Sequence, residues 1–291
     1  SWLFGPYNPS VRVGNWSEDI QLEEDTLKNF LYKRERGELL IQKTYNLFST
    51  MLKKVELSVT QDFAVHFGDQ VMLQCAGDKD RTQYFINQIP RNDCVVALNV
   101  SDPNVLFQVQ ITGKASVTGS QTIEPNQRTV FSIESVGGGQ LGAKLRYGQP
   151  FYLRTVGEHS GNLYLFSDKL SFKTENKSRH QELLLVPEPS FLTQWMCLYR
   201  NPLLRLEYEH EPVMANDELI IVHCKTNQAL AVEGKYLSRT PFGREYELAV
   251  WTYLNSHKAE EPQNHWMIVM SVPGSTVRPV PDQGKLHETV S

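Results

Sequence analysis

A short turn-and-strand pattern occurs three times in this chain and constrains its fold more than any other feature. The copies lie at residues 65–73, 145–155 and 213–222. Each contains a glycine or an asparagine, a small polar pair and then alternating apolar residues. Glycine and asparagine tolerate positive φ, and alternation with period two is typical of a strand. Each copy therefore predicts a tight turn that leads into a strand.

Two further similarities indicate that the copies belong to larger repeats. Residues 160–165 and 226–231 both show a small polar turn followed by alternating apolar residues. A compact apolar strand is expected to close each repeat, at residues 131–133, 184–186 and 266–268. Three such units, none stable alone, are typical of a β-trefoil, in which the units close one another into a capped barrel. A seven-stranded sandwich is the alternative, and the threefold recurrence argues against it.

The predicted fold is therefore mainly β, with a β-trefoil-like three-repeat domain between an N-terminal arm with a helix and a C-terminal tail. The expected segments are an extended arm at 1–16, a helical segment at 17–54, the β domain at 55–272 with repeats at about 55–136, 144–188 and 212–270, and an extended tail at 273–291. Residues 55–59 are expected to form a strand, and residues 191–208 to be irregular or briefly helical. The first repeat is the longest, so loop insertions are expected at 77–92 and 116–127.

The two N-terminal segments differ in character. The arm carries Trp2, Phe4, Tyr7 and Trp16, whereas disordered tails are depleted in aromatic residues. We therefore expect the arm to dock either on its own domain or on a partner. In the helical segment acidic residues come first and basic residues later, which complements the helix dipole, and the apolar residues follow a narrow stripe. The stripe consists of Ile20, Leu27, Phe30 and Leu31.

Charge and cysteine content limit the classes of partner and compartment. A net charge of −4 gives no basic footprint for nucleic acid or for an anionic membrane. The chain contains no apolar run of about 18 residues for a membrane span, and its first residues do not resemble a signal peptide. Its four cysteines lack a C-x-x-C pair or a repeated spacing, so we expect free buried thiols in a reducing compartment. The sequence predicts a cytosolic protein.

The search for catalytic, metal and cofactor motifs predicts none of these sites. Residues 137–142 match G-x-G-x-x-G, but the following residues predict a strand rather than the helix that would bind a pyrophosphate. We interpret them as the link between the first two repeats. The eight histidines lack the spacing of a zinc site. The acidic residues at 207–211 predict a solvated loop, so no enzyme, metal or cofactor is expected.

Three stretches resemble the cilia- and flagella-associated protein 161 family. They are Val11-Arg-Val-Gly-Asn-Trp16, Lys33-Arg-Glu-Arg-Gly-Glu-Leu-Leu40 and His66-Phe-Gly-Asp-Gln-Val-Met-Leu73. The similarity covers essentially the whole chain. The resemblance implies a structural microtubule inner protein in the lumen of the axonemal A-tubule, with the α/β-tubulin lattice and neighbouring inner proteins as its partners. It implies neither catalysis nor a small-molecule substrate.

Aromatic and arginine side chains are the usual anchors of such contacts, so the arm and the basic end of the helix are the expected partner-binding residues. They are Tyr7, Arg12, Val13, Asn15, Trp16, Arg34 and Arg36. Two alternatives stay open. One is a carbohydrate- or protein-binding β-trefoil module, although a Q-x-W motif at each closing strand is lacking. The other is an enzyme whose site forms only through space.

Overall fold

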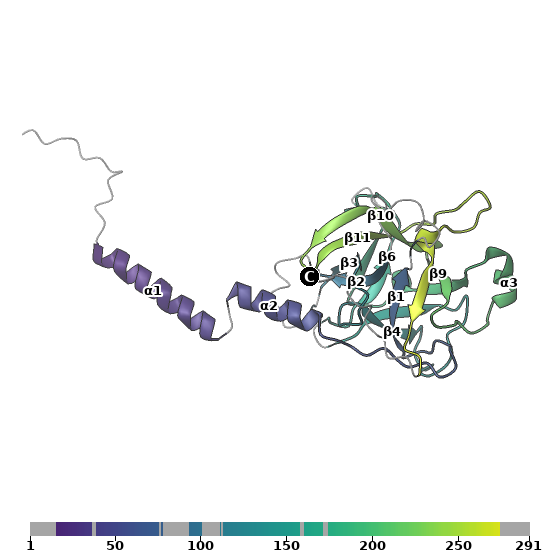
Figure 1. Ribbon diagram of the computed structural model, residues 1–291, viewed down its shortest axis with the longest axis horizontal. Helices are drawn as coiled ribbons and strands as arrows, with labels where there is room; N and C mark the ends of the chain where they lie inside the picture. Colours follow the sequence, from purple (N-terminus) through teal and green to yellow (C-terminus); the bar gives the residue numbers. More distant parts are fainter. Residues whose placement is uncertain are drawn as a thin grey trace, which may run out of the picture. The chain divides into compact units, whose positions relative to one another are not determined.

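The computed structural model describes residues 16–36, 39–75, 77, 93–100, 111, 113–157, 160–170 and 174–273. The chain divides into two compact units, Ser1–Phe48 and Ser49–Ser291 (Figure 1). The predicted arm, apart from Trp16, and the predicted tail after residue 273 lie outside the described residues, as does most of the expected loop at 77–92.

The first unit contains two helices, α1 (Trp16–Glu35) and the start of α2 (Leu40–Met51). Both lie in the segment predicted to be helical, except that α1 begins one residue earlier, at Trp16 in the predicted arm. An ion pair one turn apart supports α1, because Lys28 Nζ lies 3.5 Å from Glu24 Oε2. The predicted apolar stripe is largely open to solvent, with Leu27 57% and Phe30 48% exposed.

The second unit is mainly β, as predicted, and its strand pairs are antiparallel. The strands are β1 (Gln70–Cys75), β2 (Cys94–Asn99), β3 (Ala115–Ser120), β4 (Val130–Ser135), β5 (Phe151–Thr155), β6 (Tyr164–Ser167), β7 (Gln181–Val186), β8 (Trp195–Tyr199), β9 (Glu218–His223), β10 (Gln228–Thr240), β11 (Gly243–Val250) and β12 (Trp266–Val269). Short helices are η3 (Phe191–Thr193), η4 (Pro202–Leu204), α3 (Arg205–Tyr208) and η5 (Pro262–Asn264).

The three copies of the turn-and-strand pattern meet in a closed ring of backbone hydrogen bonds. The Leu145 N–H donates to the Val65 carbonyl at 2.8 Å, and the Val65 N–H donates to the Val213 carbonyl at 2.9 Å. The Val213 N–H completes the ring by donating to the Leu145 carbonyl at 2.8 Å. All three side chains are fully buried. Three segments that are far apart in sequence therefore occupy equivalent positions around one centre.

The turn residue of each copy has positive φ, as its residue type predicts. The angles are 97° at Gly68, 79° at Gly148 and 63° at Asn216. Each of these residues donates its N–H to the carbonyl of a nearby strand residue, at 2.7 to 2.9 Å. The acceptors are Ile133 in β4, Cys197 in β8 and Ile268 in β12.

Residues 184–186 lie in a strand, β7, as expected, but this pattern assigns the closing position of the second copy to another strand. The equivalent strand is β8, within the segment 191–208 that was expected to be irregular or briefly helical. The indole N–H of Trp195 in β8 donates to the Leu165 carbonyl at 2.9 Å, and that of Trp266 in β12 donates to the Leu230 carbonyl at 2.9 Å. Both tryptophans are fully buried and each is followed by methionine.

Two other local predictions were wrong. The expected insertion at 116–127 contains most of β3, a strand with little apolar surface. Its Gly119 allows close packing, since an added Cβ would lie 2.9 Å from Cys94 Sγ. Residues 55–59 form no strand; an isolated bridge lies at Val59 and another just before the segment, at Lys54. Their backbone bonds go to separate segments, so no continuous ladder can form.

A buried ion pair fixes the far end of the long β10–β11 hairpin. The Arg128 guanidinium donates to the Glu245 carboxylate through Nη1 at 2.7 Å and Nη2 at 2.9 Å, and the two side chains are 3% and 2% exposed. Thr118 Oγ1 donates to the same carboxylate at 2.6 Å, and Arg128 Nε donates to the Leu98 carbonyl at 2.9 Å. The guanidinium also lies 3.8 Å from the centroid of the Phe242 ring. Each guanidinium nitrogen of Arg128 and both carboxylate oxygens of Glu245 therefore have a hydrogen-bond partner, which offsets the cost of burying the two charges.

Candidate partner-binding site

The basic end of α1 holds the two predicted contact residues whose side chains the structure describes. Arg34 lies in the last turn of α1 and Arg36 directly follows the helix, and both are exposed. The Arg36 guanidinium lies 4.3 Å from the centroid of the Tyr32 ring. The Arg34 carbonyl accepts a hydrogen bond from Gln42 Nε2 at 3.1 Å. Cations at a helix C-terminus complement the helix dipole. The structure thus brings Arg34 and Arg36 together at one exposed helix end.

The side chains of the other predicted contact residues are not among those that the structure describes. Trp16 is the first residue of α1, and its side chain is not among those described. Tyr7, Arg12, Val13 and Asn15 lie outside the described residues. Exposed apolar side chains accompany the arginines on α1, among them Leu27 and Phe30. A surface with both aromatic or aliphatic and arginine side chains is the kind that anchors protein contacts.

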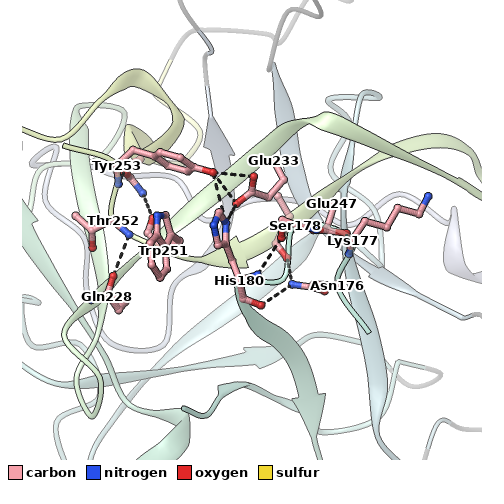
Figure 2. Close-up of polar contacts among 12 residues, drawn as sticks. Asn176, Lys177, Ser178, His180, Gln228, Glu233, Glu247, Trp251, Thr252 and Tyr253 are labelled. Carbon is pink, nitrogen blue, oxygen red and sulfur yellow. Dashed lines mark hydrogen bonds and ion pairs between the residues drawn. The ribbon is translucent and has the colours of Figure 1, made fainter. Parts of the chain in front are cut away.

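A cluster in the second unit joins a histidine, a glutamate and a tyrosine (Figure 2). The Glu233 side chain is 5% exposed, and its carboxylate accepts from His180 Nδ1 at 2.6 Å. The Tyr253 hydroxyl donates to the two Glu233 oxygens, which lie at 3.0 and 2.9 Å. The His180 ring stacks on Trp251 with centroids 4.4 Å apart. Burial and the hydrogen bond to Glu233 raise the pKa of Tyr253.

The cluster acts as a link between loops and strands. A second buried carboxylate, that of Glu247 in β11, accepts from the backbone N–H groups of Lys177 at 2.7 Å and Ser178 at 3.0 Å (Figure 2). Together, Glu233 and Glu247 fasten the segment before β7 to the β10–β11 hairpin. Sequence reasoning missed this link because His180 and Glu233 are 53 residues apart and no local pattern connects them. The carboxylates are engaged within the fold, so the arrangement favours a structural role.

A polar cleft of about 1020 Å³ lies between the end of β8, the start of β9 and the segment around η5. Two of its four carboxylates pair with arginines: Arg200 Nη1 lies 2.8 Å from Glu218 Oε2, and Arg205 Nη2 lies 2.6 Å from Glu260 Oε2. His265 Nε2 donates to the Glu260 carbonyl at 3.0 Å. Burial lowers the pKa of His265, which favours its neutral form. The described residues contain no group of three histidine, cysteine or carboxylate side chains that could hold a metal ion.

The remaining motifs follow the sequence predictions, except that Glu207 lies in the short helix α3 and not in a loop. Residues 137–142 connect β4 to β5, and their four glycines have positive φ, so the motif is a link with a strand after it. The acidic side chains at 207, 209 and 211 are exposed to solvent. Among the helices that the structure describes, none is long and apolar enough to cross a membrane.

The four cysteines are free thiols, as predicted. Three are buried, and Cys224 is partly buried. Burial raises the pKa of Cys75 to about 12 and that of Cys224 to about 11, and it also raises the pKa values of Cys94 and Cys197. Because the thiolate is the reactive form, these thiols are suited to packing and not to nucleophilic chemistry.

Fold and surface together define a mainly β protein with a helical N-terminal segment whose exposed residues include a basic helix end. The family model described as "Cilia- and flagella-associated protein 161-like domain" matches residues 43–271. The protein named "Cilia- and flagella-associated protein 161" in Danio rerio is 44% identical over 276 residues, which cover 92% of this chain and 89% of that protein. Its namesake in Bos taurus is 38% identical over 92% of this chain and 83% of its own length. The chain belongs to the cilia- and flagella-associated protein 161 family.

Solved structures show likeness of fold only. A Caenorhabditis elegans protein with unknown function has a TM-score of 0.50 and 12% sequence identity, covering 72% of this chain and 98% of its own. The SDF2-like protein from Arabidopsis thaliana has a TM-score of 0.48 and 11% identity, covering 72% of this chain and 99% of its own.

Proposed function

We propose that this chain is a structural protein of cilia and flagella that binds the lumenal wall of the doublet A-tubule. Its partners in this proposal are the α/β-tubulin lattice and neighbouring inner proteins, and it braces the wall without catalysis. Family membership carries the proposal, because proteins named for cilia and flagella align with 92% of the chain at 38 to 44% identity. A repeating lattice also adds avidity, so moderate individual contacts suffice.

The exposed end of α1 supports a contact with an acidic protein surface. Lys33, Arg34 and Arg36 carry three positive charges against the single negative charge of Glu35, and all four side chains are exposed. Charge complementarity of this kind guides association and fixes the orientation of the partners. Leu27 and Phe30 add apolar area to the same helix. Both kinds of side chain are therefore available to a partner on α1.

The proposal includes a β-trefoil as the rigid body of the protein. The ring formed by Val65, Leu145 and Val213 supports it, since each segment donates to one neighbour and accepts from the other. The equivalent turn residues and the paired roles of Trp195 and Trp266 support it independently. A body closed in this way resists deformation because its units complete one another's core.

In the same proposal the arm contributes Tyr7, Arg12, Val13, Asn15 and Trp16 to partner contacts. Deleting residues 1–16 is expected to lower the amount of protein retained in isolated axonemes. Equal retention of the full chain and the shortened chain would remove the arm from the proposal.

Charge reversal tests the basic end of α1 separately. Arg34→Glu with Arg36→Glu is expected to weaken lattice binding by about 1–2 kcal/mol in total, roughly 5- to 30-fold in affinity. The matched control is Arg239→Glu with Arg244→Glu, which changes the net charge equally at exposed positions paired across the β10–β11 hairpin. Binding is measured as the fraction retained in axonemes at increasing salt. Equal loss in both variants contradicts a specific role for α1.

A further inference from the structure

Two neighbouring leucines stand exposed on a protrusion of the β unit. The protrusion, residues 201–211, contains η4 and α3 and is called the knob here; Figure 1 shows α3 lying away from the strands. Leu203 is 90% exposed and Leu206 is 85% exposed. Residues three apart on a helical turn lie on the same side of it. The two side chains therefore form one apolar tip.

The base of the knob is held firmly. The rings of Tyr199 and Tyr208 stack with centroids 3.9 Å apart and an interplanar angle of 3°. Arg205 donates through Nε to the Tyr199 carbonyl at 2.9 Å and forms its ion pair with the largely buried Glu260. Arg146 Nη1 donates to the His210 carbonyl at 2.7 Å. The turn that carries the leucines is thus anchored on both of its sides.

Such an arrangement suggests a contact surface. Single exposed apolar residues are common on proteins and need no explanation. Here the two leucines are adjacent and their turn is fixed, so a partner that buries them meets little loss of conformational freedom in this chain. Preorganised apolar side chains of this kind are typical anchors of protein interfaces.

The charges around the tip define the chemistry of the partner. Glu207, Glu209 and Glu211 are exposed beside the leucines. Of the nearby cations, Arg200 and Arg205 are each paired with a glutamate of the adjoining cleft, and Arg146 donates to the His210 carbonyl, so three glutamates face one arginine that has no glutamate partner among the described ion pairs. A negative rim around an apolar tip complements an apolar pocket with a basic rim.

We propose that the knob docks into a basic surface of a second protein and that Leu203 and Leu206 fill an apolar pocket there. This contact is distinct from the one assigned to α1, whose basic end suits an acidic partner. The chain would then join two partners of opposite charge. The inference rests on the proposed function in one respect, because the axoneme is where the partner is sought.

Carbodiimide cross-linking of isolated axonemes tests the contact, since it joins carboxylates to lysines in direct contact. The expected products link Glu207, Glu209 or Glu211 to lysines of another protein. Leu203→Ser with Leu206→Ser is expected to lower their yield by about tenfold. Leu141→Ser is the matched control, since Leu141 is 86% exposed in the link between β4 and β5. Unchanged products in the double variant, or knob products confined to this chain, overturn the proposal.

A binding measurement with the purified full chain keeps the two proposals separable. The probes are a labelled helical peptide of about 15 residues with leucines on one face and lysines along the borders of that face, and the same peptide with glutamates in place of the lysines. We expect the lysine peptide to bind wild type and to lose about tenfold in affinity with the Leu203→Ser, Leu206→Ser variant. Equal affinity for wild type and variant, or tighter binding of the glutamate peptide, overturns the knob proposal. Absence of the chain from axonemes would instead refute the proposed function, and the peptides alone would then decide on the knob.

Discussion

Replacing Glu245 by alanine is expected to destabilise the β unit strongly, because it leaves a buried cation without its counter-charge. The Arg128 side chain is 3% exposed, so water cannot replace the lost carboxylate without local opening. The variant also removes the acceptor of the Thr118 hydroxyl. The Leu98 carbonyl and the Phe242 ring would be the remaining partners described for the guanidinium.

The expected loss follows from this geometry. Removing one member of a buried ion pair costs about 3–5 kcal/mol. A domain is usually stable by only about 5–15 kcal/mol, so the loss is a large share of the total. Arg128→Met with Glu245→Ala removes the isolated charge and keeps apolar contact with Phe242. That double variant leaves the Leu98 carbonyl and the Thr118 hydroxyl without these partners, which costs about 1–3 kcal/mol.

Urea unfolding measures these differences through tryptophan fluorescence, since Trp195 and Trp266 are fully buried in the β unit. Glu207→Ala is the control, because this exposed side chain should change the free energy of unfolding by less than about 0.5 kcal/mol. A loss of under about 1 kcal/mol for Glu245→Ala would refute the reasoning. The reasoning would also be refuted if the stability loss of the double variant equalled the sum of the losses of Glu245→Ala alone and Arg128→Met alone.

Three further predictions address protonation, thiol reactivity and backbone conformation. Burial lowers the pKa of His223, although its Nε2 donates to the Leu192 carbonyl at 3.0 Å. The unfolded state therefore binds more protons than the folded state below about pH 6.5. The urea midpoint should decrease as the pH is lowered from about 7 to 5, and it should decrease less steeply in His223→Gln. Equal pH dependence of the midpoint in the two proteins would contradict this. A thiol reagent at about pH 7.5 should modify Cys224 slowly and the three buried cysteines only after unfolding. Fast modification of a buried cysteine in the native protein would contradict this assignment. Gly148→Ala should cost about 1–2 kcal/mol in urea unfolding, because φ is +79° although the added Cβ meets no atom within 4 Å. Gly113→Ala, whose Cβ also meets open space, should change stability by less than about 0.5 kcal/mol, and equal effects of the two substitutions would argue against a conformational cause.

The sequence predicted the features that depend on backbone conformation and on local alternation. Positive φ at Gly68, Gly148 and Asn216 follows from the residue types that tolerate it. The strands after these turns follow from period-two alternation. Their meeting in a ring could be expected once the three copies were recognised as equivalent.

The sequence predictions failed where a strand forms without the expected apolar pattern. β3 consists mostly of small and polar residues, yet its backbone pairs with β2 over five residue pairs and has short contacts with β7 and β11. β8 was missed because its apolar run lies between two short helical segments, η3 and η4, the second of which begins with a proline. The pair Trp195-Met196, repeated at Trp266-Met267, was the available signal for it.

The polar links could not be predicted from the sequence, since their partners are far apart in the chain. Arg128 and Glu245 are separated by 117 residues, and a single arginine and glutamate have no identifying spacing. The same holds for His180 and Glu233. The candidate partner-binding residues were accessible to sequence reasoning only through the family resemblance and the composition of the arm. Of these, Arg34 and Arg36 have side chains that the structure describes.

Cryo-electron tomography of axonemes with and without this protein tests directly whether it binds the lumenal wall of the A-tubule. Subtomogram averages of the doublet microtubules are compared, and the missing density is located relative to the tubulin wall. We expect density of this protein's size to be lost from the lumenal face of the A-tubule and to return when the full chain is restored. Loss of density only outside the wall, or unchanged density in the lumen, would contradict it.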